Sequence, residues 1–111
     1  MSWKAFRKLM THDVEVYKIF TDGFGDESET LVGTEKGFFE YGGRQMYSKE
    51  HGTIKGTAVL YLKADSNYDA TEDAKWIFKD VKNGRYLRLE QWNVMDDPRT
   101  GKTNHYELDL I

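Results

Sequence analysis

The stretch WIFKDVKNGRYLRLEQWNVMDDPRTGKTNHYELDLI, residues 76–111, reads as three consecutive antiparallel strands. Aromatic and branched residues alternate with polar ones in it, as in strands that bury one face. Asn83-Gly84 and the segment DDPRTG at residues 96–101 supply the turn signals between the strands. No catalytic elbow or cofactor-binding turn interrupts these strands, so functional residues are expected in the loops elsewhere.

The turn chemistry of this stretch predicts a strand register. Asn and Gly tolerate the positive φ angles of a two-residue type I′ turn, which would pair Phe78 with Leu89 and Asp80 with Leu87. A turn at 96–101 would then place Leu89 opposite Leu108. The predicted core face comprises Phe78, Leu87, Leu89, Tyr106, Leu108 and Leu110. The same register predicts a charged outer ladder of Lys79, Arg88 and Asp109, and places His105 opposite Trp92.

The connection at 96–101 also has the residues that a tight turn needs. Asp97 can bond the turn backbone, Pro98 presets its own φ angle, and Gly101 accepts a positive φ. A Gly-Lys pair beside a threonine could suggest phosphate binding, but a Walker loop lies between a strand and a helix. The turn interpretation is therefore preferred.

The rest of the chain predicts a mainly β domain. Residues 13–20, 35–41 and 57–64 are rich in β-branched and aromatic residues, and the last of them, apolar on both faces, is predicted to be central. Residues 2–10 have apolar side chains at helical spacing after a serine cap, which indicates a short N-terminal helix. Glycine-rich segments at 22–34 and 42–56 are predicted to be two long loops. We expect a single domain, residues 1–111, forming a small antiparallel β-barrel or sandwich of about six strands.

Composition narrows the classes of function. The chain has 16 basic and 19 acidic residues and a net charge of −3, which does not favour non-specific nucleic-acid binding. It has no cysteine, which excludes disulfides and favours a reducing compartment of synthesis. No apolar run is long enough to span a membrane, so we expect no membrane partner.

Motifs for catalysis and for metal binding are not found. His12, His51 and His105 are far apart and lack metal-ligand spacing. The acidic segment at 22–29 does not fit an EF-hand and is interpreted as a solvated or partner-facing loop. No serine lies in a nucleophile motif, so we expect no enzymatic activity, no metal and no cofactor.

Basic and aromatic residues also alternate in the last third. They could form a stacking platform for single-stranded nucleic acid, as in some barrels. The preferred interpretation is that these side chains pack a small core and extend to its rim, given the acidic overall balance. The residues concerned are Arg85, Tyr86, Arg88 and Trp92.

The sequence from residue 35 onward resembles that of a known protein family. The segments that carry this resemblance best are GTIKGTAVLYLKAD at 52–65 and the stretch 76–111. Its features are the Asn-Gly hairpin, a strand ending in Trp-Asn-Val at 92–94, the acidic turn at 96–101 and the closing strand at 105–108. This pattern, covering roughly two thirds of the chain, resembles the head–tail joining proteins of long-tailed bacteriophages and prophages. These head-completion or stopper proteins are also called minor capsid proteins.

The resemblance implies a structural virion protein. It implies a β-barrel that assembles as a ring of about twelve copies beneath the portal and its adaptor. Such a ring closes the DNA-filled head through a projecting loop, touches packaged DNA and presents a surface to tail proteins. The expected location is the virion neck, after synthesis in the host bacterial cytoplasm.

Two sets of candidate residues follow from this resemblance. The channel loop would lie at 42–56, with candidate residues Arg44, Gln45, Tyr47, Lys49 and His51. Subunit or tail contacts would lie on the acidic segment, at Asp22, Asp26, Glu27 and Glu29. Two alternatives stay open: a tail-completion protein on the other side of the joint, and a stand-alone β-barrel that binds single-stranded nucleic acid.

Overall fold

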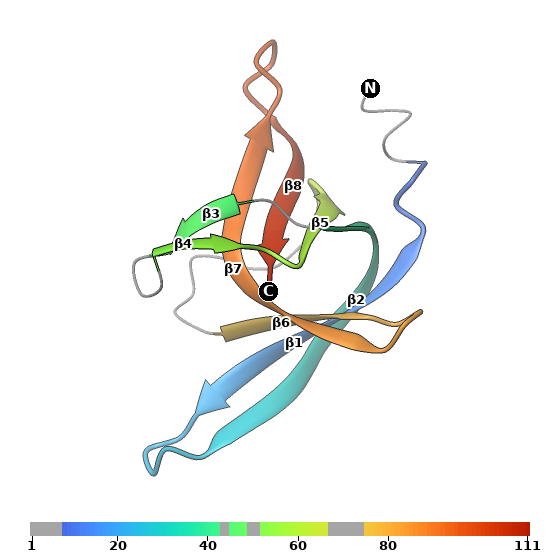
Figure 1. Ribbon diagram of the computed structural model, residues 1–111. Coiled ribbons are helices and arrows are strands. Elements are labelled where there is room, and N and C mark those ends of the chain that lie inside the picture. The colour runs from blue at the N-terminus through green and yellow to red at the C-terminus, as the bar shows by residue number, and fades with distance from the viewer. Residues whose placement is uncertain (1–7, 43–44, 49–51, 67–74) are drawn as a thin grey trace.

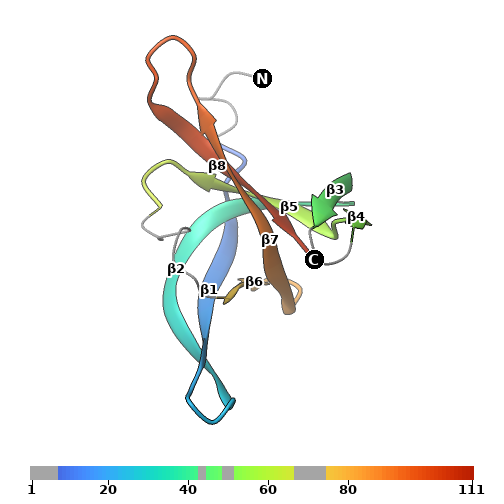
Figure 2. The ribbon, with the colours of Figure 1, turned by 90° about the vertical axis from the view of Figure 1, so that its left-hand side faces the viewer.

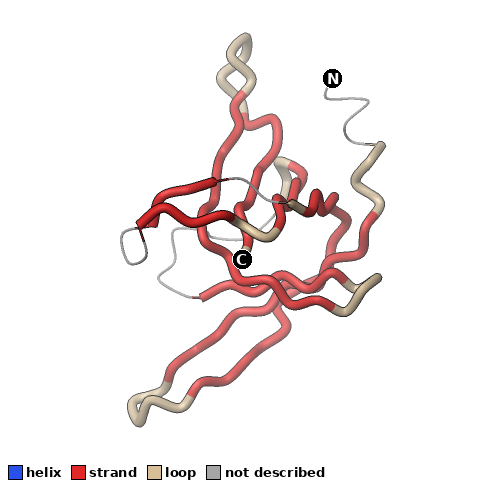
Figure 3. Tube along the Cα trace, in the orientation of Figure 1, coloured by secondary structure: helices blue, strands red, loops and turns tan. Residues whose placement is uncertain are grey.

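The computed structural model describes residues 8–42, 45–48, 52–66 and 75–111, and the regular elements in these ranges are all β-strands (Figure 3). The predicted mainly β class is therefore confirmed. The strands are β1 His12–Thr21, β2 Glu27–Tyr41, β3 Gln45–Ser48, β4 Gly52–Lys55, β5 Ala58–Lys63, β6 Lys75–Asp80, β7 Arg85–Asp96 and β8 Thr103–Leu110.

Six of these strands form one antiparallel sheet. Their order is β1-β2-β5-β8-β7-β6, and β6 pairs back onto β1, so the sheet curves into a barrel-like ring (Figure 1). β5 lies between β2 and β8, which confirms that residues 57–64 contain a central strand. β3 and β4 pair only with each other among the described strands, as a separate two-stranded hairpin.

Two long hairpins extend beyond the body of the sheet. The β1–β2 hairpin projects from one end of the molecule and the β7–β8 hairpin from the opposite end, and both views show this arrangement (Figures 1 and 2). The body between them is where the six strands face one another. The projecting ends therefore have fewer chain neighbours than the body.

The core lies inside the sheet and confirms the predicted face. Phe78, Leu108 and Leu110 are fully buried, Leu87 is nearly so, and Leu89 and Tyr106 pack against them. Strands β1, β2, β5 and β6 contribute further alternate residues to the same cluster, as half-buried strands do. These are Val14, Val16, Phe39, Ala58, Leu60, Leu62 and Trp76.

The predicted N-terminal helix is not supported. Residues 1–7, most of that prediction, lie outside the described ranges, and Lys8 and Leu9 form a turn. The amide of Thr11 donates to the carbonyl oxygen of Leu9 at 2.8 Å, and β1 starts one residue later. Met10 is buried, so its apolar side chain anchors the chain to the body without a described helix.

The β6–β7 hairpin has a four-residue turn, so the predicted two-residue turn is wrong. Phe78 pairs with Leu87 rather than with Leu89, and Asp80 pairs with Arg85. The amide of Val81 donates to Asp13 of β1 at 3.2 Å, which draws Val81 out of the hairpin ladder. The shift amounts to two residues, so every side chain keeps its predicted face.

The β7–β8 register is also different from the prediction: Leu89 lies opposite Leu110 instead of Leu108, and a bulge after Leu89 adds a further shift of one residue. Leu89 pairs with Leu110, but Gln91 already pairs with Asp109, so β7 carries one extra residue. His105 therefore lies opposite Met95 and not opposite Trp92. No turn signal announces such an insertion.

The turn between β7 and β8 follows its predicted chemistry. The amide of Arg99 donates to Oδ1 of Asp97 at 2.9 Å, and the amide of Gly101 donates to the Asp97 carbonyl oxygen at 2.8 Å. Gly101 has a φ of +71°, the conformation that favours glycine. The turn interpretation of DDPRTG is confirmed.

The predicted charged ladder does not form. Lys79 pairs with Tyr86, and its Nζ lies 3.6 Å from Oε1 of Glu15 on β1. Asp109 is buried and pairs with Val59 and Gln91. The ladder fails because both registers on which it depended are shifted.

Both predicted long loops contain strands. Residues 27–34 belong to β2, where they pair with the second half of β1, and a bulge at Val16/Tyr17 adjusts the pairing. Residues 45–48 and 52–55 are β3 and β4. Glycine content predicted loops, but residues 27–34 find their cross-strand partner in β1, and β3 and β4 pair with each other.

Candidate functional site

The tip of the β1–β2 hairpin is a closed turn. Oδ1 of Asp22 accepts hydrogen bonds from the amides of Phe24, at 2.8 Å, and Asp26, at 2.9 Å. The amide of Asp22 donates to the Asp26 carbonyl oxygen at 2.9 Å, and Gly25 takes a φ of +83°. These bonds fix the backbone of the turn. The side chain of Phe24 therefore extends into solvent from a backbone position that the hydrogen bonds define.

Four predicted contact residues come together on this hairpin. Asp22 and Asp26 lie in the turn, and Glu27 and Glu29 lie at the start of β2; all four are exposed. Oε1 of Glu27 lies 3.3 Å from Nζ of Lys75 on β6. The structure places these carboxylates on a projecting strand pair, and their role in contacts stays a prediction.

Apolar side chains on the same hairpin were missed in the sequence. Phe24 is 94% exposed and Leu31 is 51% exposed, with Phe20 and Val32 also exposed. Nζ of Lys18 lies 5.0 Å from the ring centroid of Phe20. Exposed apolar groups gathered on one element mark interaction surfaces. The signal in the sequence was Gly-Phe-Gly at 23–25, because an aromatic residue in a glycine turn has no core within reach.

The predicted channel-loop residues fall in and around β3. Arg44, Lys49 and His51 lie outside the described residues. Gln45 pairs with Lys55 and Tyr47 pairs with Thr53 in the β3–β4 ladder. This segment is a hairpin, and its place in a channel is untested.

The turn of the β6–β7 hairpin is held by a polar cluster around the buried Asp80. Asp80 is buried, and its Oδ2 accepts a hydrogen bond from Oη of Tyr41 at 2.7 Å. Nδ2 of Asn83 donates to the same Oη at 2.9 Å, and the Arg85 guanidinium lies 4.9 Å from the Tyr41 ring centroid. Burial and then the Asp80 hydrogen bond raise the pKa of Tyr41. The cluster ties this turn to the end of β2.

A second polar cluster lies on the outer face between the two hairpins. Oη of Tyr17 donates to Oε1 of Glu15 at 2.8 Å, and the Tyr17 and Tyr86 rings lie 5.8 Å apart. Lys79 Nζ lies 5.0 Å from the Tyr86 ring centroid. The hydrogen bond to Glu15, more than the other contacts, raises the pKa of Tyr17 to about 12. The hydrogen bond between the Lys79 ammonium and Tyr86 is the main cause that raises the pKa of Lys79.

This cluster predicts a loss of stability in strong alkali. A pKa of about 12 for folded Tyr17 exceeds the usual value near 10, so the folded state holds this proton more tightly. Its stabilising contribution is complete below pH about 10 and falls as the pH rises toward about 12. We expect the stability advantage of the natural protein over Tyr17→Phe to shrink through this window. Urea titrations of both proteins at several pH values measure it, and a pH-independent difference would contradict the assignment.

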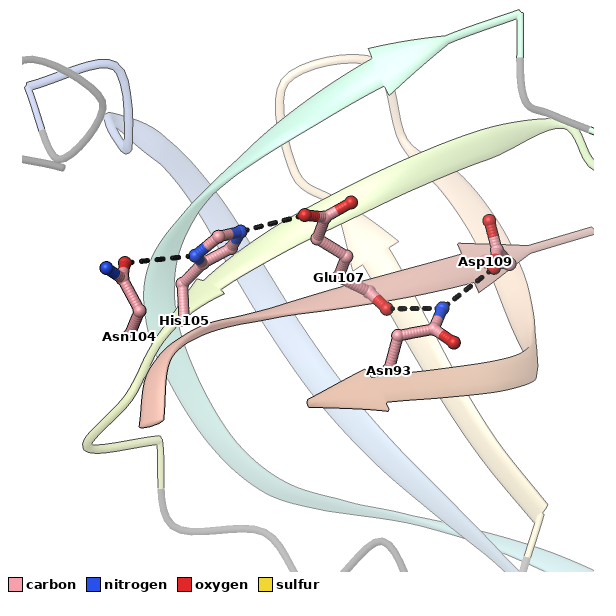
Figure 4. A network of polar contacts seen from close by, with 5 residues as sticks. All are labelled: Asn93, Asn104, His105, Glu107 and Asp109. Carbon is pink, nitrogen blue, oxygen red and sulfur yellow. Dashed lines mark hydrogen bonds and ion pairs between the residues drawn. The ribbon is translucent and has the colours of Figure 1, made fainter. Parts of the chain in front are cut away.

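A polar network follows β8 on the outer face (Figure 4). Nε2 of His105 lies 2.9 Å from Oε2 of Glu107, and Nδ1 lies 3.1 Å from Oδ1 of Asn104. Nδ2 of Asn93 donates to the Glu107 carbonyl oxygen and to Oδ2 of Asp109, both at 2.9 Å. The bond from Asn93 to Asp109 partners the buried carboxylate, and both bonds from Asn93 join β7 to β8. The role of this network is therefore structural.

The four residues of the predicted stacking platform do not share one exposed surface. Tyr86 is 53% exposed, and Arg85 and Arg88 are exposed beside it. Trp92 instead packs against the core, with its ring centroid 5.0 Å from that of Tyr106. The partly buried Trp92 thus packs against the core, as the preferred interpretation expected, whereas Tyr86 and the two arginines are exposed.

An open hollow of about 470 Å³ lies beside β2 and the end of β5. Three of its polar groups have partners among the described residues: Oγ of Ser66 donates to Oε1 of Glu35 at 2.7 Å, and Lys36 pairs with Asp13. Because its lining mixes both signs of charge, it points to no ligand class. It is lined by Val32, Thr34, Glu35, Lys36, Lys63, Asp65 and Ser66.

The described histidines have local partners. Nδ1 of His12 accepts a hydrogen bond from the amide of Phe39 at 3.1 Å, and its ring stacks on Phe38 at 5.1 Å. Over the part of the chain that the structure describes, no three metal-ligating side chains cluster. In those same ranges, no helix has the length and apolar character of a membrane span.

Comparison with protein-family models, with curated proteins and with solved structures found no match to this chain. Functional inference therefore depends on the residues themselves. The β1–β2 hairpin, with its acidic side chains and exposed Phe24, is the strongest candidate for a functional surface.

Proposed function

We propose that this protein is a structural component of the phage neck that joins the DNA-filled head to the tail and closes the portal channel as a ring. The proposal starts from the resemblance over residues 35–111. The observation that supports it best is the exposed Phe24 in a hydrogen-bonded turn at the tip of a projecting hairpin, with Leu31 exposed on the same strand pair. Such a surface suits a protein that acts by binding other proteins.

In this proposal each protomer is a closed β-barrel with projecting contacts. The body of six strands serves as the rigid part, and the β1–β2 and β7–β8 hairpins reach beyond it from opposite ends (Figure 2). A heterologous contact repeated by rotation closes into a ring. Portal or adaptor proteins would bind one side of the ring and tail proteins the other.

The β3–β4 segment is the proposed channel element. A hairpin at 45–55 suits a projection into the channel, where it would meet packaged DNA. Deleting residues 45–53 should release DNA from filled heads while leaving the ring intact. Heads that keep their DNA and still join tails would show that another segment closes the channel.

The direct test is removal of the gene from the phage or prophage that carries it. We expect DNA-filled or leaking heads and separate tails in electron micrographs, with joining restored by the natural gene supplied in trans. Complete, infectious virions in the absence of this protein would refute the proposal.

Two other functions would give different results. A tail-completion protein would be found on isolated tails rather than on isolated heads, which immunolabelling of the two fractions distinguishes. A nucleic-acid-binding module would show tight, salt-sensitive binding of single-stranded DNA. The exposed Tyr86, Arg85 and Arg88 favour that function, whereas Trp92, which packs against the core, does not.

A further inference from the structure

The outer part of the β1–β2 hairpin is acidic, whereas Lys18 and Lys36 lie nearer the body of the sheet. Residues 19–35 contain five carboxylates and no lysine, arginine or histidine. Glu27, Glu29 and Leu31 alternate along β2, so they share one face of the strand, and Phe24 stands at the tip beyond them. The tip therefore presents Phe24 beside the carboxylates of Asp22, Asp26 and Glu29, whereas Glu27 is paired with Lys75.

The β6–β7 hairpin has the complementary character. Residues 79–88 contain four basic residues, Lys79, Lys82, Arg85 and Arg88. The single acid in this segment, Asp80, is buried. Val81 and Tyr86 are exposed between the basic side chains. This hairpin therefore presents apolar groups within a positive field.

The two hairpins point to different sides of one molecule. The β1–β2 tip and the β6–β7 turn lie far apart in Figure 1, at the lower end and at the side of the body. The acidic tip of one copy is therefore free to approach the basic turn of another. Complementary charge on separate patches favours association between copies and fixes its direction.

We propose that copies of this chain associate head to tail, with the acidic β1–β2 tip of one copy docked on the basic β6–β7 hairpin of the next. This deepens the proposed ring and rests on that function for its biological setting. Phe24 packs against Tyr86 and Val81, while Asp26 and Glu29 face Lys82 and Arg88. The contact is heterologous, so it repeats from copy to copy.

Disulfide trapping tests the contact directly, because the natural chain has no cysteine. Phe24→Cys protein is mixed with Tyr86→Cys protein under mild oxidation. We expect a mixed disulfide dimer, and a ladder beyond dimers from the double variant. Phe24→Cys mixed with Thr100→Cys is the matched control, since Thr100 is exposed in the turn between β7 and β8. Equal yields with Tyr86→Cys and Thr100→Cys would refute the contact.

Charge reversal provides a second, independent readout on the same trapped pair. Asp26→Lys with Glu29→Lys in the Phe24→Cys chain should lower the trapping yield at low salt, by about tenfold for a change of 1.4 kcal/mol. Lys82→Glu with Arg88→Glu in the Tyr86→Cys chain should restore it. A reversal without effect, or without rescue, would overturn the charge pairing.

The two proposals fail separately. If trapping is specific but the gene deletion gives normal virions, the contact between copies is supported and the neck function is refuted. If the deletion gives a neck defect but trapping is not specific, the neck function is supported and this contact between copies is refuted.

Discussion

Replacing Phe78 with alanine is expected to lower the free energy of unfolding by about 3–5 kcal/mol. Phe78 is fully buried, and on β6 it pairs with Val16 on one side and Leu87 on the other. Its ring therefore fills the middle of the core between three strands. The total free energy of unfolding of a domain of this size is about 5–15 kcal/mol, so this substitution would remove much of the stability. Urea denaturation followed by tryptophan fluorescence measures the change.

The matched control for Phe78 is its neighbour on the opposite face. Ile77 points outward and is only half buried, so Ile77→Ala should cost clearly less than Phe78→Ala. Equal costs for the two variants would mean that the core is not inside the ring of strands.

Gly37→Ala is expected to destabilise the protein by about 1–3 kcal/mol, although alanine is the smallest possible change. A Cβ atom on Gly37 would lie 2.9 Å from the carbonyl oxygen of Tyr61 and 3.0 Å from Cδ2 of Leu62. The nearer atom belongs to the backbone of β5, which cannot move without disturbing the β2–β5 ladder. Glycine is therefore needed where β2 passes close to β5.

Gly23 offers a matched control for this substitution. A Cβ atom there would meet no atom within 4 Å, so Gly23→Ala should change the stability by less than about 0.5 kcal/mol. Thermal unfolding of the two variants side by side distinguishes a steric cause from a general glycine effect. A stable Gly37→Ala protein would show that β5 can shift.

Short-range patterns predicted much of the fold. The strands of the last third, the Asp97 turn and the inward faces of Phe78, Leu108 and Leu110 follow from alternation and turn chemistry. The register errors left these faces largely intact for a physical reason. At the β6–β7 hairpin the shift was two residues, and strand side chains repeat with a period of two.

The candidate site was predicted only in part. Asp22, Asp26, Glu27 and Glu29 were singled out by charge, and they do lie on one projecting hairpin. Their segment was predicted as a loop because glycines and carboxylates are frequent in it. Pairing with β1 makes it a strand, and that partner cannot be read from local propensity.

The alternation of side chains and the turn residues are local properties, so the sequence alone determined the β class, the strands of the last third, the Asp97 turn and the core face of those strands. Pairing between distant segments decided the rest: the length of β2, the bulges at Val16/Tyr17 and after Leu89, and the ring order of the strands. The exposure of Phe24 belongs to this second group. A side chain is exposed or buried according to what the rest of the fold brings near it, and here the fold carries the hairpin beyond its core.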